Sequence, residues 1–115
     1  MKSNTPINFL GLVDKSTGMI NDDTHELNGK TIKNSILVFP GGRGSSVGAY
    51  TIYSLFSNKS SPKAMICLDA DSTVVSGCAI GNIPLVIISK ELFDTLYSGD
   101  IVDIDTGQSE KIKKR

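Results

Sequence analysis

Residues 40–46, with the sequence PGGRGSS, are the part of the chain best suited to chemistry. Three glycines remove the Cβ atoms that would keep the main chain away from a ligand. Arg43 offers a planar set of donors that fits a carboxylate or a phosphate, and Ser45 and Ser46 add two hydroxyl groups. The segment therefore predicts a site for a small anion, with Arg43, Gly44 and Ser46 as binding residues.

Two predicted elements position this segment. The β-branched, apolar run 35–39 is typical of a buried strand, and Pro40 ends it. From Val47 onward the apolar spacing is that of an amphipathic helix, with a buried face predicted at Ala49, Ile52, Tyr53 and Phe56. A helix that starts here directs its first N–H groups and the positive end of its dipole towards the loop, which favours an anion.

The known nucleotide loops do not match by spacing. A P-loop needs Gly-Lys-Ser/Thr after four intervening residues, and the dinucleotide fingerprint needs glycine where Val47 stands. Nucleotide binding is therefore disfavoured. The residues alone leave two interpretations open, an anion site and a tight turn in which a serine only caps the helix.

The remaining pattern alternates strands and helices. Further strands are predicted at 7–13, 64–68, 84–88 and 101–104, with a turn at 14–18 before Met19 and Ile20. Ser89 is expected to cap a last helix with Leu92, Phe93 and Leu96 on its apolar face and Gly99 as its left-handed terminator. Residues 72–80 stay undecided, and the basic tail 111–115 is expected to be a frayed end. This order predicts an α/β domain with a small mixed sheet.

Other titratable side chains are weaker candidates. His25, the only histidine, lies in a polar segment and is expected to be exposed and non-catalytic. Asp69 and Asp71 offer a carboxylate pair for a metal or for acid–base work, but a strand end and a helix cap are the favoured interpretation. For Tyr50 and Tyr53 we expect packing in the core or at an interface.

Composition limits the class of protein. A chain of 115 residues with 39% hydrophobic content predicts one domain over 1–115. Twelve basic residues balance twelve acidic ones, and there is no basic stripe with aromatics, so nucleic acid is not an expected partner. No apolar run approaches the ~20 residues of a membrane span, and no signal-peptide core follows Met1, so a cytoplasmic protein is expected. Cys67 and Cys78 are expected to be buried thiols, too few to hold an iron–sulfur cluster.

The segment 36–50 (ILVFPGGRGSSVGAY) resembles the signature of the swivel-domain half of the aconitase X family. The resemblance continues through 6–14, 17–20, 27–30, 77–80, 83–86 and 99–100, and so covers nearly the whole chain. It implies a swivelling β/β/α domain like the C-terminal domain of aconitase. Such a domain closes over a larger subunit that carries a four-iron four-sulfur cluster, so that this chain alone binds no cofactor.

The resemblance also implies an activity and a role for Ser45. It implies a hydro-lyase that dehydrates a small phosphorylated hydroxy acid, (R)-5-phosphomevalonate, to trans-anhydromevalonate 5-phosphate in archaeal isoprenoid biosynthesis. Ser45 matches the proton acceptor of the family. Two alternatives stay open: another dehydratase of this family, for example one acting on cis-3-hydroxyproline, and an anion-binding module without catalysis.

Overall fold

Three parallel strands form the centre of the computed structural model. They are β2 (Ile36–Phe39), β4 (Ala64–Cys67) and β5 (Leu85–Ile87), in the spatial order β2-β4-β5. The structure describes residues 1–9, 12–43, 48–69, 72–99, 102–105 and 111–114. The strands predicted at 35–39, 64–68 and 84–88 are confirmed, because each is a short apolar run that ends at turn residues.

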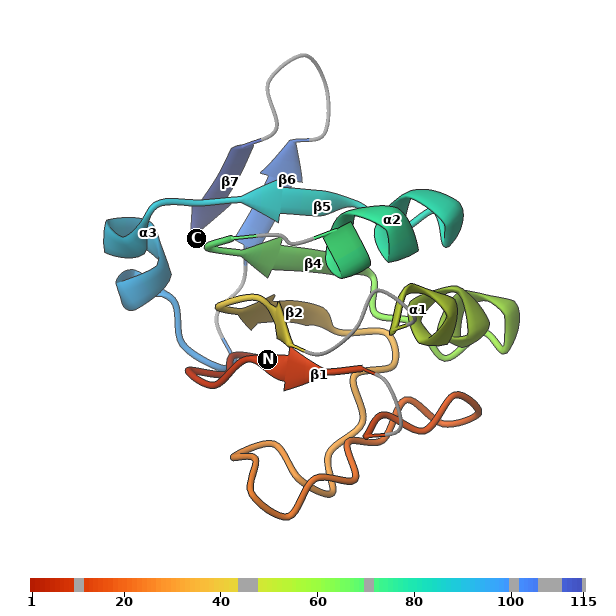
Figure 1. Ribbon diagram of the computed structural model, residues 1–115. Helices are drawn as coiled ribbons and strands as arrows, with labels where there is room; N and C mark the ends of the chain where they lie inside the picture. Colours follow the sequence, from red (N-terminus) through yellow and green to blue (C-terminus); the bar gives the residue numbers. More distant parts are fainter. Residues whose placement is uncertain (10–11, 44–47, 70–71, 100–101, 106–110, 115) are drawn as a thin grey trace.

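Helices α1 (Gly48–Ser57) and α2 (Ser72–Ile80) connect these strands and lie side by side on one side of the molecule (Figure 1). The region that the sequence left undecided is therefore a helix. The two helices cover the sheet face to which Leu37, Phe39, Met65 and Cys67 contribute, and Ile52, Leu55 and Val74 belong to the same buried cluster. Strands that alternate with helices in this way confirm the predicted α/β class, but the central sheet is parallel and not mixed, because each pair of its neighbouring strands is joined by a helix.

The buried face of α1 differs from the predicted one. Ala49 and Ile52 are buried as expected, but Tyr53 is 44% and Phe56 43% exposed, and Leu55 is fully buried. The close approach of α2 explains this phase: a Cβ atom on Gly77 would lie 2.7 Å from Ile52, so the two helices are in contact there. The packing of α1 on α2 turns Tyr53 and Phe56 outward.

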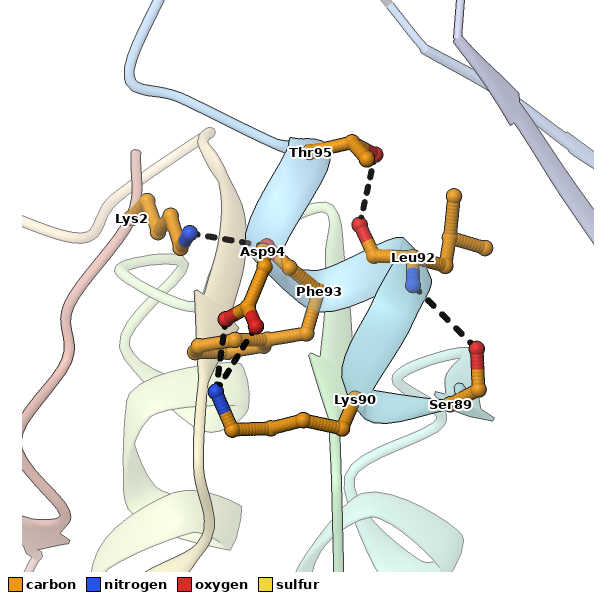
Figure 2. Close-up of polar contacts among 7 residues, drawn as sticks. All are labelled: Lys2, Ser89, Lys90, Leu92, Phe93, Asp94 and Thr95. Atoms are coloured by element: carbon orange, nitrogen blue, oxygen red, sulfur yellow. Dashed lines mark hydrogen bonds and ion pairs between the residues drawn. The ribbon is translucent and has the colours of Figure 1, made fainter.

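Helix α3 (Lys90–Thr95) covers the other face, where Phe93 and Leu96 pack with Val38, Ile66 and Val86. Ser89 caps it as predicted, since its Oγ accepts from the N–H of Leu92 at 3.2 Å (Figure 2). Gly99 is left-handed, with φ of 94°, but it is not the terminator. The helix ends at Thr95, and Leu96 is already extended.

The amino-terminal segment borders the sheet on the β2 side. Residues 1–3 run parallel to β2: Ser3 N–H donates to Val38 O, and Val38 N–H to Met1 O, both at 2.8 Å. The predicted strand at 7–13 is shorter than expected, because β1 comprises Ile7–Asn8 only. A bridge between Val13 and Ile20 closes the predicted turn at 14–18.

The carboxyl-terminal residues form a hairpin of β6 (Val102–Asp105) and β7 (Lys111–Lys114). The predicted frayed tail is therefore wrong for residues 111–114. The antiparallel register sets Asp103 opposite Lys113 and Asp105 opposite Lys111. Among the helices described, none has the length and apolar character needed to cross a membrane.

Candidate active site

The glycine-rich segment starts at the carboxyl end of β2. Pro40 follows the strand, Gly41 is buried, and β3 (Gly42–Arg43) then pairs with β1. Helix α1 begins at Gly48, so the loop leads from a strand to a helix, as predicted. The predicted site residues Gly44, Ser45 and Ser46 lie outside the described residues, and for Arg43 the structure gives the main chain only.

Gly41 fixes the loop against the neighbouring strand. The N–H of Asp69, just beyond β4, donates to Pro40 O at 3.1 Å, and the N–H of Ile7 donates to Gly41 O at 3.1 Å. A Cβ atom on Gly41 would lie 2.6 Å from the carbonyl oxygen of Asp69, closer than real Cβ contacts come. Glycine is thus required at 41 for packing between two strands, a role that the sequence did not reveal.

Arg43 is held in place through its main chain. The register of β3 sets Gly42 against Ile7 and Arg43 against Asn8. Next along the chain to these paired segments, the rings of Phe9 and Phe39 pack edge to face, with centroids 5.9 Å apart, and both side chains are buried. The start of the loop therefore adjoins two buried, packed aromatic side chains.

A polar cluster of Ser3, His25 and Glu26 anchors the segment that leads into β1. His25 is only 6% exposed, so the predicted exposed position is wrong. Its Nδ1 accepts from Leu27 N–H at 3.0 Å, which leaves the proton of the neutral ring on Nε2, facing Thr5 O at 3.2 Å. The histidine is buried because these main-chain groups satisfy both of its ring nitrogens.

This cluster is not a hydrolytic triad, although it contains the three residue types. The Oγ of Ser3 lies 3.3 Å from His25 Nε2, but the other ring nitrogen faces a main-chain N–H and not a carboxylate. Ser3 is fully buried and unavailable to a substrate. The cluster therefore has a positioning role.

Glu26 completes this anchor as a carboxylate. Partial burial acts to raise its pKa, but hydrogen bonds outweigh that effect and hold the pKa below the ordinary 4.5. The donors are the N–H of Asn4, at 2.6 Å, and the Oγ of Ser3, at 3.0 Å, with a contribution from Thr5. The negative charge thus holds residues 3–5, immediately before β1.

The remaining candidates for metal binding are dispersed. Cys67 and Cys78 are buried as predicted, the Sγ of Cys78 lies 3.5 Å from the Sδ of Met65, and burial raises the pKa of Cys78 to about 12. Asp71 lies outside the described residues, so the predicted pair with Asp69 has no described geometry. In the described part of the chain, no three Cys, His, Asp or Glu side chains come together. These residues do not fit an iron–sulfur cluster, which takes three or four ligands.

Comparison with known proteins identifies the family. The sequence model of the aconitase X swivel domain matches residues 1–113. The chain belongs to the aconitase X swivel domain family. The predicted resemblance is thereby confirmed, and with it the expected swivel-domain fold.

Individual relatives agree with this assignment. The phosphomevalonate dehydratase small subunit of Methanosarcina acetivorans is 42% identical over 98% of this chain and 81% of its own length. That of Methanosarcina mazei is 45% identical over 87% of this chain and 70% of its own. The crystal structure of aconitase X from Thermococcus kodakaraensis, in its holo form, superposes with a TM-score of 0.92 at 37% identity and covers 100% of this chain and 86% of that one.

Proposed function

We propose that this swivel domain is the small subunit of a hydro-lyase that dehydrates (R)-5-phosphomevalonate to trans-anhydromevalonate 5-phosphate. The similarity to the phosphomevalonate dehydratase small subunit of Methanosarcina acetivorans, 42% over 98% of the chain, carries this proposal. The partner is a larger subunit of the aconitase X type. This chain contributes the glycine-rich loop to an active site that the two subunits share.

The reaction breaks one C–H and one C–O bond. The proton on the carbon next to the carboxylate goes to the Oγ of Ser45, a double bond forms to the neighbouring carbon, and the hydroxyl group of that carbon leaves. Together with the proton it makes one molecule of water. Because serine is a weak base, Ser45 must act as an alkoxide, which main-chain N–H groups of the loop and the charge of Arg43 would stabilise.

The described geometry supports this proposal at the two ends of the loop. Hydrogen bonds to Pro40 and Gly41 tie its start to β4 and β1, and α1 receives its end at Gly48. Arg43, Gly44 and Ser46 are proposed to bind the carboxylate or the phosphate of the substrate.

We assign the four-iron four-sulfur cluster to the larger subunit. The described residues of this chain do not offer a set of ligands for it, and the chain contains two cysteines in all. Its own residues then act on the proton and on the anionic groups of the substrate, while the Lewis-acid chemistry of the cluster comes from the partner.

The test is reconstitution of both chains under anaerobic conditions. The product conjugates its double bond with the carboxylate, so turnover is followed as a rise in ultraviolet absorbance when (R)-5-phosphomevalonate is added. We expect the complex to be active and each chain alone to be silent. Activity on cis-3-hydroxyproline in place of phosphomevalonate, or binding of phosphate without any turnover by the assembled complex, would contradict the proposal.

A further inference from the structure

A groove runs between α2 and the outer edge of β5. Its volume is about 540 Å³. Val75 and Ala79 of α2 form one wall, Leu85 and Ile87 of β5 form the other, and Asp69 stands at the end near the carboxyl ends of the strands. Val75 is 48% and Ile87 51% exposed, so both α2 and β5 present an exposed aliphatic side chain to this apolar groove.

The β5 edge beside this groove has main-chain groups available for pairing. Met65 N–H donates to Pro84 O, and Ile88 N–H donates to Cys67 O, so the even-numbered residues 84–88 face β4. The N–H and C=O groups of Leu85 and Ile87 therefore point to the outer side. Within the described residues no strand pairs with that side of β5. An extended chain would find both hydrogen-bonding groups and apolar pockets here.

Asp69 connects the groove to the catalytic loop. Asp69 lines the groove, its main-chain N–H donates to Pro40 O, and its carbonyl oxygen lies next to Gly41. Among the described residues that line the groove, Asp69 alone carries a charge. A chain that occupies the groove thus arrives at the active-site loop and meets a negative charge there.

We propose that an extended segment of the larger subunit adds a strand to the β5 edge, places aliphatic side chains between α2 and β5, and pairs a basic residue with Asp69. This inference rests on the proposed function, since it takes its partner from there. The larger subunit fits because it must meet the loop next to which the groove ends. A second copy that paired through its own β5 would bring no cation, because residues 81–87 contain no basic side chain.

The test compares two isoleucines with equal exposure. Ile87 lines the groove, whereas Ile80, at the end of α2, does not; each is 51% exposed. Because burying a charge against apolar walls is costly, we expect Ile87→Glu to raise the dissociation constant for the larger subunit about tenfold or more. Ile80→Glu should leave it unchanged. Circular dichroism and thermal melts establish that both variants fold, and Val75→Glu gives an independent measurement from the opposite wall if Ile87→Glu does not fold.

Asp69→Asn tests the charge pair. It is expected to raise the dissociation constant about two- to fivefold at low salt and to make binding less dependent on salt, because an exposed ion pair is screened. Wild-type affinity in both Ile87→Glu and Val75→Glu would overturn the proposal. So would equal weakening by Ile80→Glu, or self-association of this chain that Ile87→Glu abolishes. Wild-type chains that assemble without dehydrating phosphomevalonate would instead overturn the proposed function. The proposal that the larger subunit binds in the groove would then still stand.

Discussion

The two outer edges of the parallel sheet differ in whether other described segments of the chain pair with them. On the β2 side, residues 1–3 pair with Val38, and β1 and β3 continue this cover up to Arg43. On the β5 side, the groups of Leu85 and Ile87 face outward beside an apolar groove. An open edge is a template for unwanted pairing, so a protein normally covers it or gives it to a partner.

This difference separates two tasks within one small domain. The covered edge carries the glycine-rich loop that we propose to be catalytic, and hydrogen bonds to Pro40 and Gly41 hold the start of this loop. The open edge, by our inference, receives the larger subunit. Changes on the β2 side should therefore affect turnover and stability with little effect on assembly, and changes on the β5 side should do the reverse. The following predictions test that separation, in order of decreasing effect.

The largest effect is expected from Ser45→Ala. If Ser45 accepts the proton, this variant should lose about 10²–10⁴ in turnover, as other positioned acid–base groups do, and still bind the larger subunit with wild-type affinity. Substrate deuterated at the carbon that loses its proton should exchange with solvent in the wild-type complex and not in the variant. Ser46→Ala is the neighbouring control and should cost much less. Exchange retained in Ser45→Ala but lost in Ser46→Ala would move the base by one residue.

Gly41→Ala should lower stability by about 1–3 kcal/mol, the usual cost of overpacking. The added Cβ atom would lie 2.6 Å from Asp69 O and push β2 and β4 apart below the loop. Chemical denaturation measures the loss, and turnover should fall with it. Gly29→Ala is the control: its Cβ atom would meet nothing within 4 Å, so only the positive φ of 83° costs energy, about 1 kcal/mol, and activity should be unchanged. An equal loss of activity in both variants would contradict this role of Gly41.

Ser3→Ala should cost about 1–2 kcal/mol, because it leaves buried polar groups without their partner. The Oγ of Ser3 accepts from Thr5 N–H at 3.0 Å and contacts both His25 and Glu26. The segment before β1 should loosen, which amide hydrogen exchange at Ile7 would report. Ser16→Ala, an exposed serine in a turn, should change neither quantity. A Ser3→Ala variant as stable as wild type would show that the cluster does not anchor this edge.

The smallest effect concerns acid stability. Because the folded-state pKa of Glu26 is lowered, the ionised carboxylate stabilises the folded state. This contribution to the free energy of unfolding is complete above the ordinary pKa of 4.5 and is lost as the pH falls below that value. Glu26→Gln should therefore be less stable than wild type at neutral pH. The difference in stability between the two proteins should shrink as the pH drops from about 5 to 3. Thermal melts across this range measure the difference. A gap that stays constant with pH would contradict the assigned charge.

The strands and most helix positions were predictable from the sequence because they depend on local patterns. The run 35–39, its termination at Pro40 and the cap at Ser89 follow from β-branched residues, proline geometry and a serine hydroxyl, none of which needs tertiary information. The buried face of α1 was only partly predictable. Its apolar residues fit two phases, and contact with α2 at Gly77 selects the one with Leu55 inside.

The errors at His25 and in the tail share one cause. Both segments are polar, which predicts exposure, but each finds its partner elsewhere in the chain. The ring nitrogens of buried His25 contact Thr5 O and Leu27 N–H, and residues 111–114 pair with β6. For the site, sequence and resemblance indicated the loop and Ser45, which remains a prediction. The role of Gly41 and the groove beside β5 needed the spatial neighbours of Asp69, which no spacing along the chain reveals.

Lys2 connects the amino-terminal segment that pairs with β2 to helix α3, and this contact bears on local unfolding of the domain. Helix α3 has no basic residue in its last turn, and Lys2, 91 positions away from Phe93, donates its Nζ to the carbonyl of Phe93 at 2.7 Å (Figure 2). The same ammonium group lies 4.4 Å from the centre of the Phe93 ring. Unfolding of α3 would therefore release the residues that pair with Val38. The amides of Ser3, Val38 and α3 are expected to exchange with solvent in one cooperative opening. The stability of α3 would then set how often residues 1–3 separate from the β2 edge.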